Sequence, residues 1–253
     1  MTKSKELIGC ILDTETTGID GAVIESARME LTATPLEFIR VKPEDSYMDA
    51  KLYGIPEGVE MKLGALMTHG ILPESLDGLE PFKGFSYYGK YVVGHNVDYD
   101  VEVTGYHGAS RICTLALSRF MWPGLDSHRQ EAVLLHIGKI SGRGYAWALD
   151  LLKNAHRAAD DVMNCSRILK VIIHQLSKRE DMKHHVESWG ALSEFSLECS
   201  IPKVMPFGKF KDKPLVEVEQ DWLDYMYKQP DFKLDRYLVT GLRRAGKTLP
   251  ENA

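Results

Sequence analysis

The run ELIGCILD, residues 6–13, decides the fold, because it is mostly apolar, has the length of a strand and leads directly into the turn-like TETTGID. A short apolar run bounded by turn residues is typical of a buried strand. Two more strands are predicted in AVIESARMEL (22–31) and PLEFIRVKP (35–43), after short connections. Strands joined so closely pair antiparallel. The sequence therefore predicts a sheet that begins with antiparallel strands.

The following residues alternate between predicted strands and helices. Residues 44–60 are polar and are expected to form a loop. We expect a strand at 91–96, a short strand running into a helix over 111–122, and helices at 61–71, from Val97 onward, at 130–140 and at 159–176. Strands followed by alternating strands and helices predict a mixed sheet that is flanked by helices.

Composition and charge restrict the class of protein. Hydrophobic residues make up 44% and charged residues 26% of the chain, as in ordinary soluble proteins. No apolar run approaches the ~20 residues that span a bilayer, and the N-terminus lacks a signal-peptide pattern, so we expect a cytoplasmic protein. The four cysteines form no CxxC pair, which argues against a zinc site. Residues 203–253 carry a net charge of +2 and residues 1–202 a net charge of −7. Part of this acid excess fits a metal site.

Two acidic residues follow the first predicted strand. Asp13 and Glu15 are two positions apart, so their carboxylates point to one face of the strand. Two like charges at that separation repel, and burial increases the cost unless a cation lies between them. The pair is therefore either a polar strand end or half of a metal site.

Further acids follow the strand near residue 92, in VVGHNVDYD (92–100). Asn96 or Asp98 has the right position to cap the next helix, and a ligand role for Asp98 is an equal alternative. Capping does not explain Asp100, which comes one turn too late.

The stretch NAHRAADDVMN (154–164) opens the longest predicted helix. Counting back from the apolar stripe of that helix leads to Asp161, so Asp161 is expected to face the core, where an unpaired carboxylate is costly. Asp160 is expected on the polar face, and His156 in the loop before the helix, either above the acids or solvated. The predicted stripe is Cys165, Ile168, Leu169 and Ile172, and the predicted polar face also holds Asn164 and Arg167.

Together these elements supply three acid clusters and a histidine. Carboxylate oxygens are the ligands of hard divalent cations, and Mg²⁺ also binds phosphate. The chemistry that such a cluster suits is two-metal cleavage of phosphodiesters.

The three segments DTET (13–16), HNVDYD (95–100) and HRAADD (156–161) resemble, in order and spacing, the motifs of the DnaQ-like DEDDh 3′→5′ exonucleases. The resemblance covers residues 7–175. It implies an RNase H-like α/β fold, a five-stranded mixed sheet with helices on both sides. It also implies two Mg²⁺ ions, replaceable by Mn²⁺, and release of nucleoside 5′-monophosphates from the 3′ end. The implied metal ligands are Asp13, Glu15, Asp100 and Asp161, and the implied general base is His156.

The predicted organisation is an exonuclease domain at 1–178, a linker at 179–203 and a small module at 204–253. The module is predicted to be a β-hairpin followed by helix, and it resembles the tail of the exodeoxyribonuclease X branch of the family. We expect Lys209, Lys211 and Lys213 at the hairpin turn, either bound to nucleic-acid phosphates or solvated.

The resemblance further implies substrate-binding residues near the acids. The turn Thr16, Thr17, Gly18 and Ile19 is expected to contact the terminal nucleotide, with Ile19 against the base. The alternative for Ile19 is packing against the sheet edge. His69 and Asn96 are expected near the substrate.

The predicted partner is DNA, as single strands or as 3′ ends of duplexes, with no membrane partner. The alternatives are an RNA-trimming exonuclease like oligoribonuclease or RNase T, a non-catalytic nucleic-acid-binding subunit, and a proofreading subunit held by a polymerase. The sequence carries no indication of an oligomeric state.

Overall fold

The computed structural model describes residues 8–85, 89–229 and 232–250. The chain divides into two compact units, Met1–Leu197 and Glu198–Ala253. The division lies inside the predicted linker, 179–203. Trp189 in that segment is buried and donates its indole N–H to the backbone oxygen of Thr32, 2.8 Å away, so the part of the segment before Glu198 packs within the first unit.

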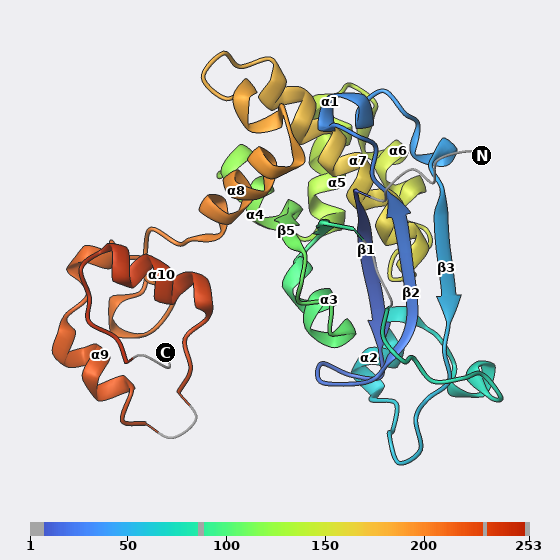
Figure 1. The fold of residues 1–253 in the computed structure, drawn as a ribbon, viewed down its shortest axis with the longest axis horizontal. Coiled ribbons are helices and arrows are strands. Elements are labelled where there is room, and N and C mark those ends of the chain that lie inside the picture. Colours follow the sequence, from blue (N-terminus) through green and yellow to red (C-terminus); the bar gives the residue numbers. More distant parts are fainter. Residues whose placement is uncertain (1–7, 86–88, 230–231, 251–253) are drawn as a thin grey trace. The chain divides into compact units, whose positions relative to one another are not determined.

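The first unit is built on a five-stranded mixed sheet in the order β3-β2-β1-β4-β5 (Figure 1). The strand β1 pairs antiparallel with β2 and parallel with β4, while β3 and β5 extend the two sides antiparallel and parallel. This confirms the predicted mixed sheet. The strands are β1 Gly9–Thr16, β2 Val23–Glu30, β3 Met48–Leu52, β4 Tyr91–Gly94 and β5 Ser110–Cys113.

The third strand is not where the sequence predicted it. The segment predicted as a strand begins instead with a short helix, α1 Pro35–Phe38, because Thr34 and Glu37 form a reciprocal capping box around Pro35. The strand β3 falls in 44–60, which was expected to be a loop. It is the edge strand of the sheet, and its middle three residues are exposed, so it lacks the apolar alternation that marks a half-buried strand.

The helices predicted at 61–71, from Val97 onward, within 111–122, at 130–140 and at 159–176 are present, whereas α6 was not predicted. No helix among the described residues is long and apolar enough to cross a membrane. The longer helices are α2 Leu63–His69, α3 Val97–Thr104, α4 Thr114–Met121, α5 Gln130–Ile140, α6 Gly144–Leu151, α7 Ala158–Ser177 and α8 Trp189–Ser200. Single turns of 3₁₀ helix are η1 Pro43–Asp45, η2 Pro73–Leu76 and η3 Lys183–Val186.

Helices cover both faces of the sheet, because alternate residues of β1 point to opposite sides. Cys10 and Leu12 pack with Val97 and Val101 of α3 in one buried cluster. The long helix α7 contacts β1 and β2. The stripe predicted on this helix, Cys165, Ile168, Leu169 and Ile172, is buried. The prediction for Asn164 was wrong, since its side chain is fully buried rather than on a polar face.

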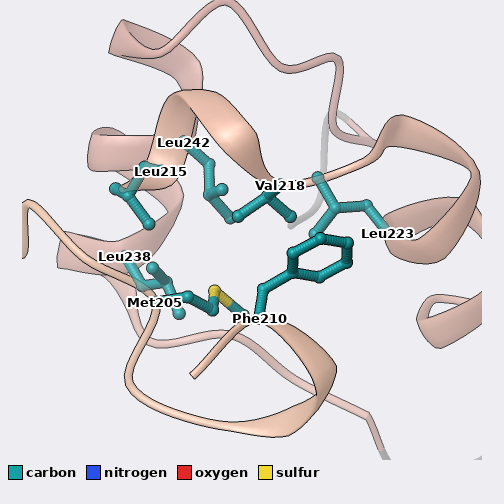
Figure 2. Packing of buried hydrophobic residues seen from close by; sticks show 7 residues of the cluster. All are labelled: Met205, Phe210, Leu215, Val218, Leu223, Leu238 and Leu242. Atoms are coloured by element: carbon teal, nitrogen blue, oxygen red, sulfur yellow. The ribbon is translucent and has the colours of Figure 1, made fainter. Parts of the chain in front are cut away.

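The second unit contains a looped segment and two helices around its own core. The arms of the predicted hairpin meet only in single bridges, Val204 with Pro214 and Met205 with Lys211. Between them lies a 3₁₀ turn, η4 Gly208–Phe210, and after them come η5 Leu215–Glu217, α9 Gln220–Met226 and α10 Arg236–Arg244. Figure 2 shows the core: Met205, Phe210, Leu215, Val218, Leu223, Leu238 and Leu242.

Candidate metal and nucleic-acid site

Three carboxylates meet at the C-terminal end of β1. Asp13 and Glu15 lie on the face of that strand opposite to Leu12, and Asp161 approaches from the first turn of α7. One ligand atom from each of the three lies within 4.8 Å of the others, close enough to share one cation. All of these ligand atoms are carboxylate oxygens, which suit a hard divalent cation.

Asp100 reaches the same end of the sheet from its other side. It lies on α3, is 4% exposed, and its Oδ1 accepts a hydrogen bond of 2.8 Å from the Thr14 hydroxyl. Thr14 stands between Asp13 and Glu15 on β1 and points to the opposite face. The motif residue Asp98, weighed above as a ligand, instead forms an ion pair with Arg111.

The carboxylates disfavour one another's charge. Burial raises the pKa of Asp13 well above its ordinary value, and the nearby Asp100, Asp161 and Glu15 raise it further. Burial, and after it the charges of Asp161, Glu25 and Asp100, raise the pKa of Glu15 to about 8. Burial also raises the pKa of Asp100 to about 7 and of Asp161 to about 6. A divalent cation bound among these carboxylates would compensate their negative charge and displace the protons that their raised pKa values retain.

Asp161 is held by the loop that precedes α7 and by the first residue of α5. Its Oδ2 accepts the backbone N–H of His156 at 3.0 Å, and its Oδ1 accepts the amide of Gln130 at 2.9 Å. His156 has a positive φ of 67°, a conformation that is uncommon for residues other than glycine. Its ring Nε2 lies 3.3 Å from Oε1 of Glu131. His156 therefore sits in the loop predicted for it, beside the acids.

An ion pair between the half-exposed Arg157 and the buried Glu25 fixes the segment that carries His156. Glu25 of β2 is 5% exposed and accepts two hydrogen bonds from the Arg157 guanidinium, at 2.7 and 3.1 Å. Its Oε2 also accepts the backbone N–H of Ala158 at 3.1 Å. Since Glu25 pairs with Glu15 across the sheet, the clamp ties the start of α7 to the strand that bears the acids.

The turn after β1 forms one wall of the site. Thr17 closes it by accepting the backbone N–H of Ala22, and the Thr16 hydroxyl donates to the oxygen of Gly18 at 2.7 Å. Ile19 at its tip is 84% exposed, which contradicts packing against the sheet edge and leaves the side chain available. His69 is buried at the end of α2, and burial lowers its pKa.

Two adjacent pockets flank the acids, and α2 lies between them, with Gly64 and Thr68 lining both. The first, of about 910 Å³, contains Glu15 and Ile19. It also includes Thr16, Thr17, Gly18, Lys62, His69 and Tyr99. The second, of about 1090 Å³, contains Asp13, Asn96, Asp161 and His156. The end of β1 and α2 lie close together in Figure 1.

Asn96 is exposed at the start of α3 with a φ of 75°, and its side chain does not cap the helix. His95 beside it is braced on both ring nitrogens, by the Thr114 hydroxyl at 2.9 Å and the backbone oxygen of His128 at 2.8 Å. Burial lowers the pKa of His95 to about 4, so the ring is neutral and Nε2–H donates to that carbonyl. His95 thus fixes the loop ahead of α5.

The three predicted lysines belong to the second unit and are described with it. Lys209 is engaged, since its Nζ lies 2.7 Å from Oε2 of Glu219 and 4.9 Å from the Phe210 ring centre. Lys211 and Lys213 are exposed, and no described acid forms an ion pair with them.

Sequence reasoning missed the residues that hold the acids and the histidine in place. These are Thr14, Glu25, His95, Gln130, Glu131 and Arg157. A signal existed for Thr14, His95 and Arg157, which lie inside the three motif segments DTET, HNVDYD and HRAADD. Glu25 and Gln130 stand at ordinary positions of a strand and a helix start. Nothing in the sequence pairs Glu25 with Arg157 and Ala158, 132 and 133 positions away, or Gln130 with Asp161, 31 positions away.

No family description matches the sequence, and no curated protein is similar enough to match. The architecture, a five-stranded mixed sheet with helices on both faces, is RNase H-like.

The chain is similar to a solved structure of exonuclease X in complex with 5′-overhanging duplex DNA, with a TM-score of 0.51 and 20% identity. The match covers 68% of this chain and 95% of that one. It is also similar to E. coli exonuclease I in a zinc-bound complex with single-stranded DNA, with a TM-score of 0.54, 16% identity and 92% of this chain covered. A complex of E. coli exonuclease I with a dT13 oligonucleotide has a TM-score of 0.54, 17% identity and 88% coverage of this chain. The chain spans 61% and 60% of the two exonuclease I chains. At these identities the likeness concerns the fold.

Proposed function

We propose that the chain is a DEDDh 3′→5′ exonuclease that hydrolyses DNA from the 3′ end and releases nucleoside 5′-monophosphates. The observation that carries the proposal is the meeting of Asp13, Glu15 and Asp161 within 4.8 Å, with Asp100 buried beside them. These residues come from three motifs far apart in the sequence, and the fold resembles those of exonuclease X and exonuclease I. Solved complexes of both enzymes contain DNA, which supports DNA as the substrate.

The four carboxylates would hold two Mg²⁺ ions, for which Mn²⁺ can substitute. Bound there, the ions would supply Lewis-acid stabilisation of charge on the scissile phosphate. His156 would accept the proton of the attacking water, a role that suits an imidazole. Glu131, 3.3 Å from Nε2, would orient the ring, and the clamp of Glu25 on Arg157 would hold its loop.

The test uses purified protein with oligonucleotides labelled at the 3′ or the 5′ end, as DNA and as RNA, in Mg²⁺ and in EDTA. We expect stepwise shortening of 5′-labelled DNA and immediate release of a labelled mononucleotide from the 3′ label, both abolished by EDTA. Faster cleavage of RNA would replace the DNA assignment with an RNA-trimming one. Binding without cleavage in Mg²⁺ and in Mn²⁺ would favour a non-catalytic subunit.

His156→Ala separates catalysis from metal binding. The variant should bind Mn²⁺ in calorimetry much as the wild type does, because the four carboxylates remain. Its turnover should fall by roughly 10²–10⁴-fold, the usual effect of losing a general base. Unchanged turnover would remove His156 from the reaction.

We also propose that Lys211 and Lys213 of the second unit contact DNA phosphates outside the site. Lys209 serves as the internal reference, because Glu219 already neutralises it. Replacing Lys211 and Lys213 together with Ala should weaken DNA binding and lower the salt slope by ~0.7 per contact on single strands. The Lys209→Ala variant should change the slope less.

A further inference from the structure

The two pockets beside the acids differ in their basic residues: the second pocket is lined by arginines and the first is not. Among the described residues, Lys62 is the single Lys or Arg that lines the first pocket, which also contains the exposed Ile19. The second pocket contains Arg119 and Arg129. The acids lie at the junction, with Glu15 in the first pocket and Asp13 in the second.

Both arginines have free guanidinium groups. Within residues 8–85 and 89–197, no acid lies within ion-pair distance of Arg119, Arg129 or Arg40, and all three are exposed. Arg143 lies over the Trp147 ring instead of an acid. The other arginines of the unit all pair with carboxylates: Arg28, Arg111, Arg157, Arg167 and Arg179. Arg119 and Arg129 are thus the unpaired arginines of this unit that line a pocket.

The backbone next to each arginine is fixed. Arg119 is the next residue after Ser118 on α4, and Arg129 the next after His128 in the loop ahead of α5. The Ser118 hydroxyl and His128 Nδ1 lie 3.1 Å apart, and the His128 carbonyl accepts the Nε2–H of His95. This bonding joins two segments and brings both arginines to one pocket. Asp126 and Glu131 also line that pocket, and Glu131 is engaged with His156.

The chemistry of the substrate explains such an asymmetry. The 3′-terminal nucleotide has a single phosphate, the scissile one, so beyond that phosphate its pocket needs no cation. The retained strand carries a phosphate at every further step, and guanidinium groups are suited to bind phosphate oxygens. A pocket with few basic residues fits the nucleoside of the nucleotide that is released, and the pocket with the two unpaired arginines fits the retained strand.

We infer that Arg119 and Arg129 form a subsite for the phosphates of the retained strand, and that they select polynucleotides over isolated nucleotide esters. The inference rests on the proposed function and adds the direction in which the strand crosses the site. The terminal nucleoside occupies the pocket of Ile19, and the retained strand leaves over α4 and the loop ahead of α5.

The experiment compares two substrates. One is the p-nitrophenyl ester of thymidine 5′-monophosphate, whose nitrophenolate leaving group replaces the retained strand. The other is a short thymidine oligonucleotide. For Arg119→Gln and for Arg129→Gln, the ratio of kcat/KM on the oligonucleotide to kcat/KM on the ester should fall roughly tenfold or more, as for a lost charged hydrogen bond. The control Arg40→Gln removes the same charge away from both pockets and should leave the ratio unchanged.

Two further measurements identify the phosphates. Neutral methylphosphonates at the retained positions should lower the wild-type ratio and have little further effect in the arginine variants. Binding of the oligonucleotide in Ca²⁺, followed by fluorescence anisotropy, should lose ~0.7 of salt slope for each variant.

An unchanged ratio in both arginine variants would overturn the inference while the proposed function stands. An equal fall on both substrates would also overturn it, since the arginines would then act at the scissile phosphate or on the fold. A wild-type protein that hydrolyses neither substrate would overturn the proposed function itself.

Discussion

Asp100→Asn should stabilise the metal-free protein at alkaline pH. Asp100 is 4% exposed and its pKa is about 7, against an ordinary 3.8, chiefly because of burial. The folded state therefore binds the proton more tightly than the unfolded chain, and the free energy of unfolding falls as pH rises from about 4 to about 7. A rise of about three pK units corresponds to ~4 kcal/mol. Because neighbouring carboxylates titrate over the same range, we expect a gain of about 2–4 kcal/mol from the substitution above pH 7.

In the wild type, Oδ1 of Asp100 accepts a hydrogen bond of 2.8 Å from the Thr14 hydroxyl. Oδ1 of an asparagine can accept the same bond, so the substitution keeps the shape of the site. Urea unfolding in EDTA is the assay, at several pH values from about 4 to about 8. The variant should match the wild type at the acid end and exceed it increasingly toward the alkaline end. In Mg²⁺ the order should reverse, because binding to the folded state stabilises the wild type more. A variant that is less stable than the wild type in EDTA at alkaline pH, or a difference that does not vary with pH, would refute the electrostatic account of the acids.

Four other substitutions test separate parts of the site. Asp161→Asn should lower turnover by orders of magnitude, whereas Asp160→Asn should only lower the free energy of unfolding by ~0.3–1 kcal/mol, because it removes a charge near a helix N-terminus. Enzyme kinetics and thermal melting distinguish the two variants, and loss of turnover in Asp160→Asn but not in Asp161→Asn would mean that the helix register is misassigned. Glu25→Gln should cost about 1–3 kcal/mol in urea unfolding because Arg157 loses a buried partner, and kcat should fall more than KM changes; unchanged stability would remove the clamp. Gly64→Ala should raise the melting temperature by an amount equivalent to at most about 1 kcal/mol, since a Cβ there meets nothing within 4 Å; a lower melting temperature would contradict this.

The sequence correctly predicted the elements whose burial produces a local pattern of apolar side chains. The buried strand β1 and the stripe of α7 are continuous apolar signals, so the type of each element was predicted correctly, and Asp161 rather than Asp160 lies with Asp13 and Glu15. The strand β3 failed for the opposite reason. It is an edge strand with three exposed residues and is stabilised by backbone pairing with β2. Backbone pairing does not require apolar side chains, so the sequence shows no hydrophobic pattern for this strand.

The candidate site divides in the same way. The four acids and His156 were predicted because their motifs are local in sequence, and the structure places Asp13, Glu15 and Asp161 together with Asp100 and His156 close by. The supporting contacts were not predicted, because they join residues far apart. Glu25 with Arg157 is an example, since 132 positions separate the two residues.

The arrangement of Asp13 and Asp100 on opposite sides of β1 has a consequence for the motions of the protein. Asp13 belongs to the layer of α7, and Asp100 to the layer of α3, whose residues Val97 and Val101 pack on the other face of the sheet. A cation bound by both carboxylates would cross-link the two layers through the end of one strand. Opening of α3 would then require release of the same ion as opening of α7. In hydrogen exchange, amides of the two helices should therefore slow together on metal binding, as one cooperative unit in place of two.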